Sequence, residues 1–148
     1  MEYNFAPMNI EYAKKIKNWR YNGFVKSIYM EPYFKNYDKE NKKLKGPSNC
    51  DGYVVLSYDE IVGLFEYYFT DDILEIGLAL NPKLVGKGLG KEFVYQGIKF
   101  GIKEFSYKGE YIKLTVNKKN KPAIKVYEKT GFLKYTENED EIEMRKYV

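Results

Sequence analysis

Three glycines and two lysines fall within the seven residues 85–91 (VGKGLGK), directly after an apolar run that ends at Pro82. Glycine lets the backbone approach a ligand closely. Apolar residues at helical spacing follow the loop, and the first turn of a helix offers free N–H groups and the positive end of its dipole to an anion. The segment therefore predicts a phosphate-binding loop, although from the loop alone a plain strand-to-helix turn remains an alternative.

Two common phosphate loops do not fit this spacing. A Walker A loop needs a glycine, four residues and then Gly-Lys-Ser/Thr. Alignment on Gly90 and Lys91 puts Val85 at the first glycine and Glu92 at the Ser/Thr position. The dinucleotide fingerprint is G-x-G-x-x-G, whereas the glycines here stand at 86, 88 and 90. The spacing thus argues against both a nucleotide hydrolase and a dinucleotide enzyme.

A second stretch, NKPAIKVYEKTGF (residues 120–132), lies thirty residues further on. Together the two stretches resemble the GNAT N-acetyltransferase superfamily. Its first signature is Arg/Gln-x-x-Gly-x-Gly/Ala opening a helix, and residues 85–90 match it except that Val85 replaces Arg or Gln. Its second signature is matched in register by Asn120, Ala123, Tyr127, Gly131 and Phe132. The stretch EIGLALNP (75–82) is also similar to the family's fourth strand and its proline.

This resemblance implies a binding site for acetyl-CoA, as co-substrate, and no metal. The backbone of the loop would hold the pyrophosphate, so the Val85 departure removes only a possible side-chain contact. The pantetheine arm would pair with the preceding strand, and Asn120 would hydrogen-bond the cofactor. The implied cofactor-binding residues are Leu78, Ala79, Leu80, Val85, Gly86, Lys87, Gly88, Leu89, Gly90, Lys91 and Asn120.

The resemblance also implies an acetyl-CoA-dependent N-acetyltransferase that moves an acetyl group to a primary amine of a small molecule or peptide, by direct transfer in a ternary complex. Such a transfer needs a proton for the departing thiolate and a neutral amine. Tyr127 is the expected general acid. Glu75 is a possible base acting through a water, and Glu66 is a weaker candidate. A core aromatic for Tyr127 and an ion-paired carboxylate for Glu75 are the structural alternatives.

The acceptor is expected to bind near residues 19–37, where aromatic side chains are frequent. Aromatic faces attract cations, and a carboxylate would add charge for a cationic amine. A core lying under a loop is the alternative interpretation of these rings. The aromatic candidates are Trp19, Tyr21, Phe24, Tyr29, Tyr33 and Tyr37, and the candidate carboxylate is Glu66.

The pattern of elements that must position these residues predicts an α/β fold. The expected GNAT fold has a mixed central sheet of about six to seven strands, about four helices and one β-α-β crossover for acetyl-CoA. A single domain, 1–148, would comprise an acceptor-side helical region (1–50) and a cofactor-binding core (51–148), with residues 39–49 as a loop. Helices are expected over 10–19, 88–105 and 121–129, and strands over 51–58, 61–69, 73–80, 111–116, 132–136 and 142–147.

Composition excludes several other classes of function. The chain has no His and one Cys, Cys50, which we interpret as an ordinary loop residue, so a His-dependent triad and an intramolecular disulfide are excluded. We expect a cytoplasmic monomer or homodimer without membrane contact. A net charge of +4 leaves a lysine-rich nucleic-acid-binding domain as an unfavoured alternative. A CoA-binding sensor of the same fold, without efficient transfer, is the other alternative.

Overall fold

The chain folds around a seven-stranded mixed sheet, and the computed structural model describes all residues from 1 to 148. The strand order is β1-β4-β5-β6-β7-β9-β8. All neighbouring pairs are antiparallel except β6 and β7, which are parallel and joined by the long helix α3. The strands are β1 (Asn4–Pro7), β4 (Asp51–Ser57), β5 (Glu60–Thr70), β6 (Ile73–Leu80), β7 (Tyr111–Asn117), β8 (Leu133–Glu137) and β9 (Glu141–Tyr147).

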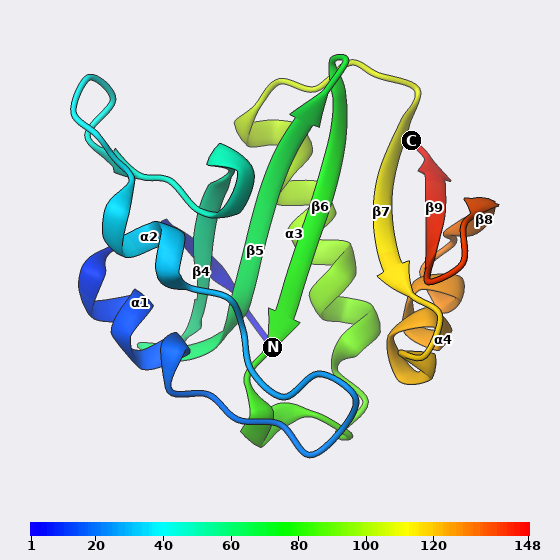
Figure 1. Cartoon of the computed structure of the whole chain (residues 1–148), viewed down its shortest axis with the longest axis horizontal. Helices are drawn as coiled ribbons and strands as arrows, with labels where there is room; N and C mark the ends of the chain where they lie inside the picture. The colour runs from blue at the N-terminus through cyan, green and yellow to red at the C-terminus, as the bar shows by residue number, and fades with distance from the viewer.

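Four α-helices cover the two faces of this sheet (Figure 1). Helices α3 and α4 lie on one face, and α1 and α2 lie on the other. None of the helices is long and apolar enough to cross a membrane. The helices are α1 (Ile10–Lys17), α2 (Glu31–Lys35), α3 (Gly90–Glu104) and α4 (Lys121–Lys129), and two short 3-10 turns span Pro47–Asn49 and Pro82–Leu84.

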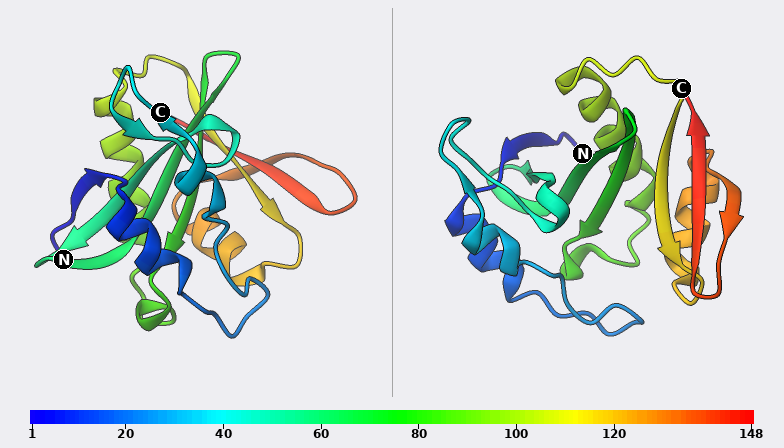
Figure 2. Two further views of the ribbon diagram at one scale, coloured as in Figure 1. Left: turned by 60° about the vertical axis from the view of Figure 1, so that its left-hand side comes forward. Right: turned by 45° about the horizontal axis from the view of Figure 1, so that its top comes forward.

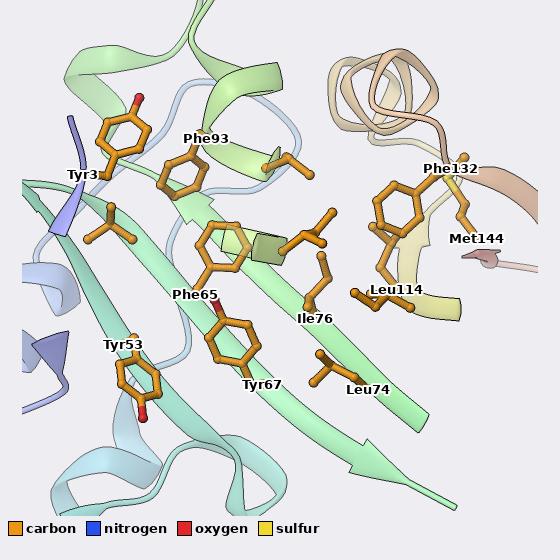
Figure 3. Packing of buried hydrophobic residues seen from close by; sticks show 14 of the residues in the cluster. Tyr3, Tyr53, Phe65, Tyr67, Leu74, Ile76, Phe93, Leu114, Phe132 and Met144 are labelled. Atoms are coloured by element: carbon orange, nitrogen blue, oxygen red, sulfur yellow. The ribbon is translucent and has the colours of Figure 1, made fainter. Parts of the chain in front are cut away.

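Each face has its own apolar core, because successive strand residues point to opposite sides of the sheet. The larger core lies under α3 and α4 and contains Phe65, Tyr67 and Phe93. Figure 3 shows these rings together with Ile76 and Leu74, while Leu114, Phe132 and Met144 gather beside β7. The smaller core lies under α1 and α2 and contains Ile16, Tyr33 and Leu64.

The sequence predicted the C-terminal two thirds of the chain nearly element by element. The α/β class and the parallel crossover are confirmed. Helix α4 has the expected bounds, and Gly131 after it has the left-handed φ of +99° that favours glycine in a C-terminal cap. Helix α3 begins at Gly90 instead of residue 88, because Gly86 and Gly88 both adopt positive φ and cannot belong to a right-handed helix.

Residues 1–50 differ from the expectation in three places. Strand β1 pairs with β4 at the sheet edge, and its four residues end in a proline, too short a run to predict. The expected loop 39–49 includes half of a small hairpin, β2 (Tyr37–Asp38) with β3 (Lys43–Leu44). Helix α1 ends at Lys17 instead of residue 19, and the side chain of its N-cap, Asn9, accepts from the Tyr12 N–H at 2.8 Å.

Candidate active site

The parallel pair β6 and β7 is in register at a single residue pair, Glu75 with Lys113, whereas β5 and β6 pair along eight residues. Beyond Glu75 the two strands diverge, with α3 behind the gap (Figures 1 and 2). We use the name strand cleft for this break in the pairing of β6 with β7, bordered by Gly77–Leu80 of β6. The sheet therefore has an unpaired inner edge along Gly77–Leu80 of β6.

The inner edge of the strand cleft offers backbone hydrogen-bonding groups. The Asn81 N–H donates to the Val62 carbonyl at 2.8 Å, and Leu80 is opposite Gly63. Because antiparallel neighbours alternate between bonded and non-bonded pairs, the amide and carbonyl groups of Leu78 and Leu80 point away from β5. These groups face the strand cleft, where an extended amide-bearing chain would satisfy them as an added strand.

The glycine loop lies between the end of β6 and the first turn of α3. Gly86 and Gly88 have φ of +78° and +76°, and open space surrounds the position of a Cβ at both. Glycine is required here for the backbone conformation and not for close packing. The N-cap of α3, Leu89, makes no side-chain cap. The free N–H groups of this 15-residue helix are therefore left for an anion.

A cavity of about 560 Å³ continues from the glycine loop between α3 and α4. Lys91, Lys129 and Lys146 supply three positive charges to it, and Thr130 supplies a hydroxyl. Only one carboxylate, Glu92, lines the same cavity, so its charge favours an anionic ligand. The glycine loop thus has a backbone conformation suited to a polyphosphate ligand, and the lysines of the cavity have the charge suited to it.

Tyr127 lies on α4, packed against the larger core, with its ring 6.0 Å from that of Phe132. Burial raises the pKa of Tyr127 to about 12. The phenol is therefore protonated at neutral pH, which is the form that donates. The alternative that Tyr127 is a core aromatic thus describes the position of its ring correctly. That alternative says nothing about the role of the hydroxyl.

Glu66 is surrounded by hydroxyl and thiol donors on the α1 and α2 face of the sheet. Tyr33 donates to its Oε2 at 2.5 Å, and Tyr68 donates to its Oε1 at 3.3 Å. The Sγ of Cys50 lies 3.8 Å from the Tyr33 hydroxyl. Burial raises the pKa of Glu66, and the hydrogen bonds from Tyr33, Tyr68 and Cys50 oppose this rise. No lysine or arginine pairs with this carboxylate.

Glu75 shares that face but has a different environment. Its Oε1 lies 3.9 Å from the Nζ of Lys113, at the closed end of the strand cleft. Burial raises the pKa of Glu75, and Lys113 opposes the rise. The ion-paired alternative for Glu75 therefore describes its surroundings, and Glu66 is the carboxylate that lacks a cationic partner.

The aromatic candidates of residues 19–37 do not form one pocket. Tyr33 is fully buried, Trp19 packs against the smaller core, and Phe24 and Tyr29 are exposed. Tyr21 donates its hydroxyl to the Leu80 carbonyl at 2.6 Å. These rings therefore lie in different surroundings, and an aromatic amine site in this segment stays a prediction.

Two further residues from the sequence analysis have surroundings that the sequence did not predict. The Oδ1 of Asn120 accepts from the Ala123 N–H at 3.4 Å, so this side chain caps α4. Cys50, which we interpreted as a loop residue, is buried beside Tyr33 and Glu66. Cys50 and Tyr68 were not identified as site residues from the sequence, and Tyr33 was expected only as part of an aromatic amine site, because only the fold brings these residues to Glu66.

Comparison with known proteins identifies relatives over nearly the whole chain. The model of the acetyltransferase (GNAT) family matches residues 15–132. The acetyltransferase PseH of Campylobacter jejuni is 29% identical over 142 residues, covering 93% of this chain and 87% of PseH. PseH from a second strain of C. jejuni is 28% identical over 145 residues, with the same coverage.

Solved structures share the fold. The crystal structure of C. jejuni N-acetyltransferase PseH in complex with acetyl coenzyme A has a TM-score of 0.74 at 23% identity and covers 99% of both chains. The spermidine N-acetyltransferase of Vibrio cholerae, in complex with CoA and spermine, has a TM-score of 0.73 at 16% identity. That alignment covers 98% of this chain and 95% of the other.

Proposed function

We propose, since this chain belongs to the acetyltransferase (GNAT) family and acetyl-CoA is its acyl donor, that it acetylates a primary amine of a small molecule or peptide by direct transfer in a ternary complex. The observation that carries this proposal is the strand cleft. Its inner edge meets the glycine loop at one end, and the carboxylates Glu66 and Glu75 lie beside it on the α1 and α2 face of the sheet.

The binding half of the proposal rests on backbone groups. Leu78 and Leu80 would pair with the pantetheine arm as a strand does. The free N–H groups at the start of α3 would bind the pyrophosphate, and Lys91, Lys129 and Lys146 would attract the remaining phosphate. Acetyl-CoA supplies a thioester carbonyl that an amine can attack, with the thiol as leaving group.

The acceptor half of the proposal rests on Glu66. A partly buried carboxylate with only neutral donors favours a cation as its next neighbour. We assign Glu66 the role of holding the acceptor's ammonium group and accepting its proton, because its raised pKa brings it closer to the working range of a base. Glu75, already paired with Lys113, remains the alternative base, acting through a water.

Tyr127 completes the proposed set as the proton donor. Its hydroxyl has no hydrogen-bond partner within the chain, and burial keeps it protonated. It would stabilise negative charge on the departing sulfur and then protonate it. From its ammonium form, the amine would lose one proton to Glu66 before attack and a second proton after it, and this second loss would balance the proton that Tyr127 supplies to the thiolate.

A thiol-release screen tests this proposal. The protein is incubated with acetyl-CoA and a panel of polyamines, aminoglycosides, amino sugars, amino acids and short peptides, and free CoA thiol is measured. We expect at least one class of primary amine to raise thiol release well above the amine-free rate, with an N-acetylated product by mass spectrometry. If no amine gives a product while CoA binds normally, the chain is a CoA-binding module and the proposal is wrong.

A further inference from the structure

The connection between α1 and α2, residues 18–29, runs past the carboxyl end of β6 (Figures 1 and 2). We call this segment the flap. Its ends are anchored, since Trp19 and Ile28 pack against the smaller core. Its tip, residues 22–27, is exposed and buries little apolar surface. Segments of this kind open at low free energy, so a single well-placed contact can decide their position.

The flap has one long-range hydrogen bond from a side chain, and it ends at the strand cleft. The Tyr21 hydroxyl donates to the Leu80 carbonyl at 2.6 Å across 59 residues of sequence. The Tyr21 N–H donates to the Lys26 carbonyl at 2.9 Å, which closes the tip on itself. At the start of the flap, Arg20 donates to the carbonyls of Lys17 and Trp19. Tyr21 therefore connects an otherwise local loop to the central sheet.

The accepting carbonyl has a particular direction. Leu80 is a non-bonded partner of Gly63, so its carbonyl points away from β5 and toward the strand cleft. A carbonyl has two lone pairs and can accept a second bond. Tyr21 thus connects the flap to the inner edge of β6 at the open end of the strand cleft. The N–H group of Leu80 is not used by this contact.

We propose that Tyr21 is a positioning residue that holds the flap closed over the strand cleft and so keeps bulk water from the thioester of bound acetyl-CoA. Water is the competing nucleophile in this reaction. It would attack the acetyl carbonyl carbon, the C–S bond would break, and the products would be acetic acid and the CoA thiol. The inference rests on acetyl-CoA occupying the cleft, and it does not depend on which amine is the acceptor.

The test compares Tyr21→Phe, which removes only the hydroxyl, with Tyr58→Phe, a matched change at a tyrosine that is 90% exposed in the β4–β5 turn. Flap opening is followed by trypsin cleavage after Lys26, which tracks the population of the open form. Acrylamide quenching of Trp19, the sole tryptophan of the chain, reports the same opening. Thiol release from acetyl-CoA is measured without any amine, and CoA binding is measured by calorimetry.

We expect Tyr21→Phe to speed cleavage after Lys26 by about two- to tenfold, the effect of losing one neutral hydrogen bond. Trp19 quenching should increase, amine-free thiol release should rise by a similar factor, and the CoA Kd should stay within about twofold. Tyr58→Phe should change none of these. Unchanged cleavage, or faster cleavage without faster thiol release, would overturn the inference. A CoA Kd that weakens as much as cleavage speeds would make Tyr21 a cofactor contact instead. Failure of the amine screen leaves these measurements unaffected.

Discussion

In the proposed complex, the two sides of the strand cleft recognise their ligands with different parts of the chain. On the cofactor side, the groups are backbone N–H and C=O groups of β6, the glycine loop and the first turn of α3. On the acceptor side, they are side chains that come from α2, from β5 and from Cys50, the residue before β4. Side-chain substitutions on the cofactor side should therefore be tolerated unless they alter the backbone conformation or the charge. Substitutions on the acceptor side should affect binding of the amine directly.

The largest effect is expected at the glycine loop. Gly88→Asp should weaken CoA binding by about 10³-fold, because the aspartate repels the pyrophosphate in addition to occupying a left-handed φ. Gly88→Asn is the matched control, since Asn tolerates the same φ without charge. It should lose no more than about tenfold, about 1.4 kcal/mol. Equal losses in the two variants would show that the loop acts by conformation alone. Calorimetry with CoA measures both.

Tyr127→Phe should come next. Loss of the proton donor should lower kcat by about 10²-fold, within the usual range for general acids, while the CoA Kd remains unchanged. Steady-state kinetics with the best amine from the screen measures the first quantity, and calorimetry measures the second. Tyr58→Phe serves as the control for a general effect of removing a phenol. An unaltered kcat would remove Tyr127 from the chemistry and leave it as a core residue.

The contributions of Glu66 and Glu75 to catalysis can then be distinguished. Glu66→Gln keeps an acceptor for the Tyr33 hydroxyl but loses the charge, so kcat/KM for the amine should fall by about 10²-fold near neutral pH. Glu75→Gln, which removes a partner of Lys113, should lower it by less than about tenfold. Rates measured over a pH series compare them. The reverse order of effects would assign the base to Glu75.

The smallest effect concerns stability. Burial raises the pKa of Glu66 in the folded chain, so this group favours folding below its unfolded pKa and loses that contribution as the pH rises through its folded pKa. Glu66→Gln does not titrate. Relative to the wild type, its Tm should therefore increase from pH 4.5 to pH 8, by a few degrees. Thermal denaturation at several pH values measures this, and a difference independent of pH would contradict the assigned burial.

The same contrast explains what could be predicted from the sequence. Spacing of glycines, prolines and apolar residues determines local backbone conformation, so the loop at 85–91, the capped helix at 121–129 and the strand before Pro82 were predictable. The surroundings of Glu66 were not, because Tyr33 and Cys50 are 33 and 16 positions away from it. The flap shows the same limit: Tyr21 was expected to face an amine, whereas the fold brings its hydroxyl to the Leu80 carbonyl, 59 positions along the chain.

Because β6 and β7 pair only at Glu75 and Lys113, the central sheet is nearly divided in two. The sheet consists of two parts, β1-β4-β5-β6 and β7-β9-β8, which pair at this one position and otherwise pack together through the larger core. A pantetheine arm bound along β6, as proposed, would bridge these two parts of the sheet. The donor substrate would thereby complete the sheet as it enters the reaction, and the gap would open again when CoA leaves.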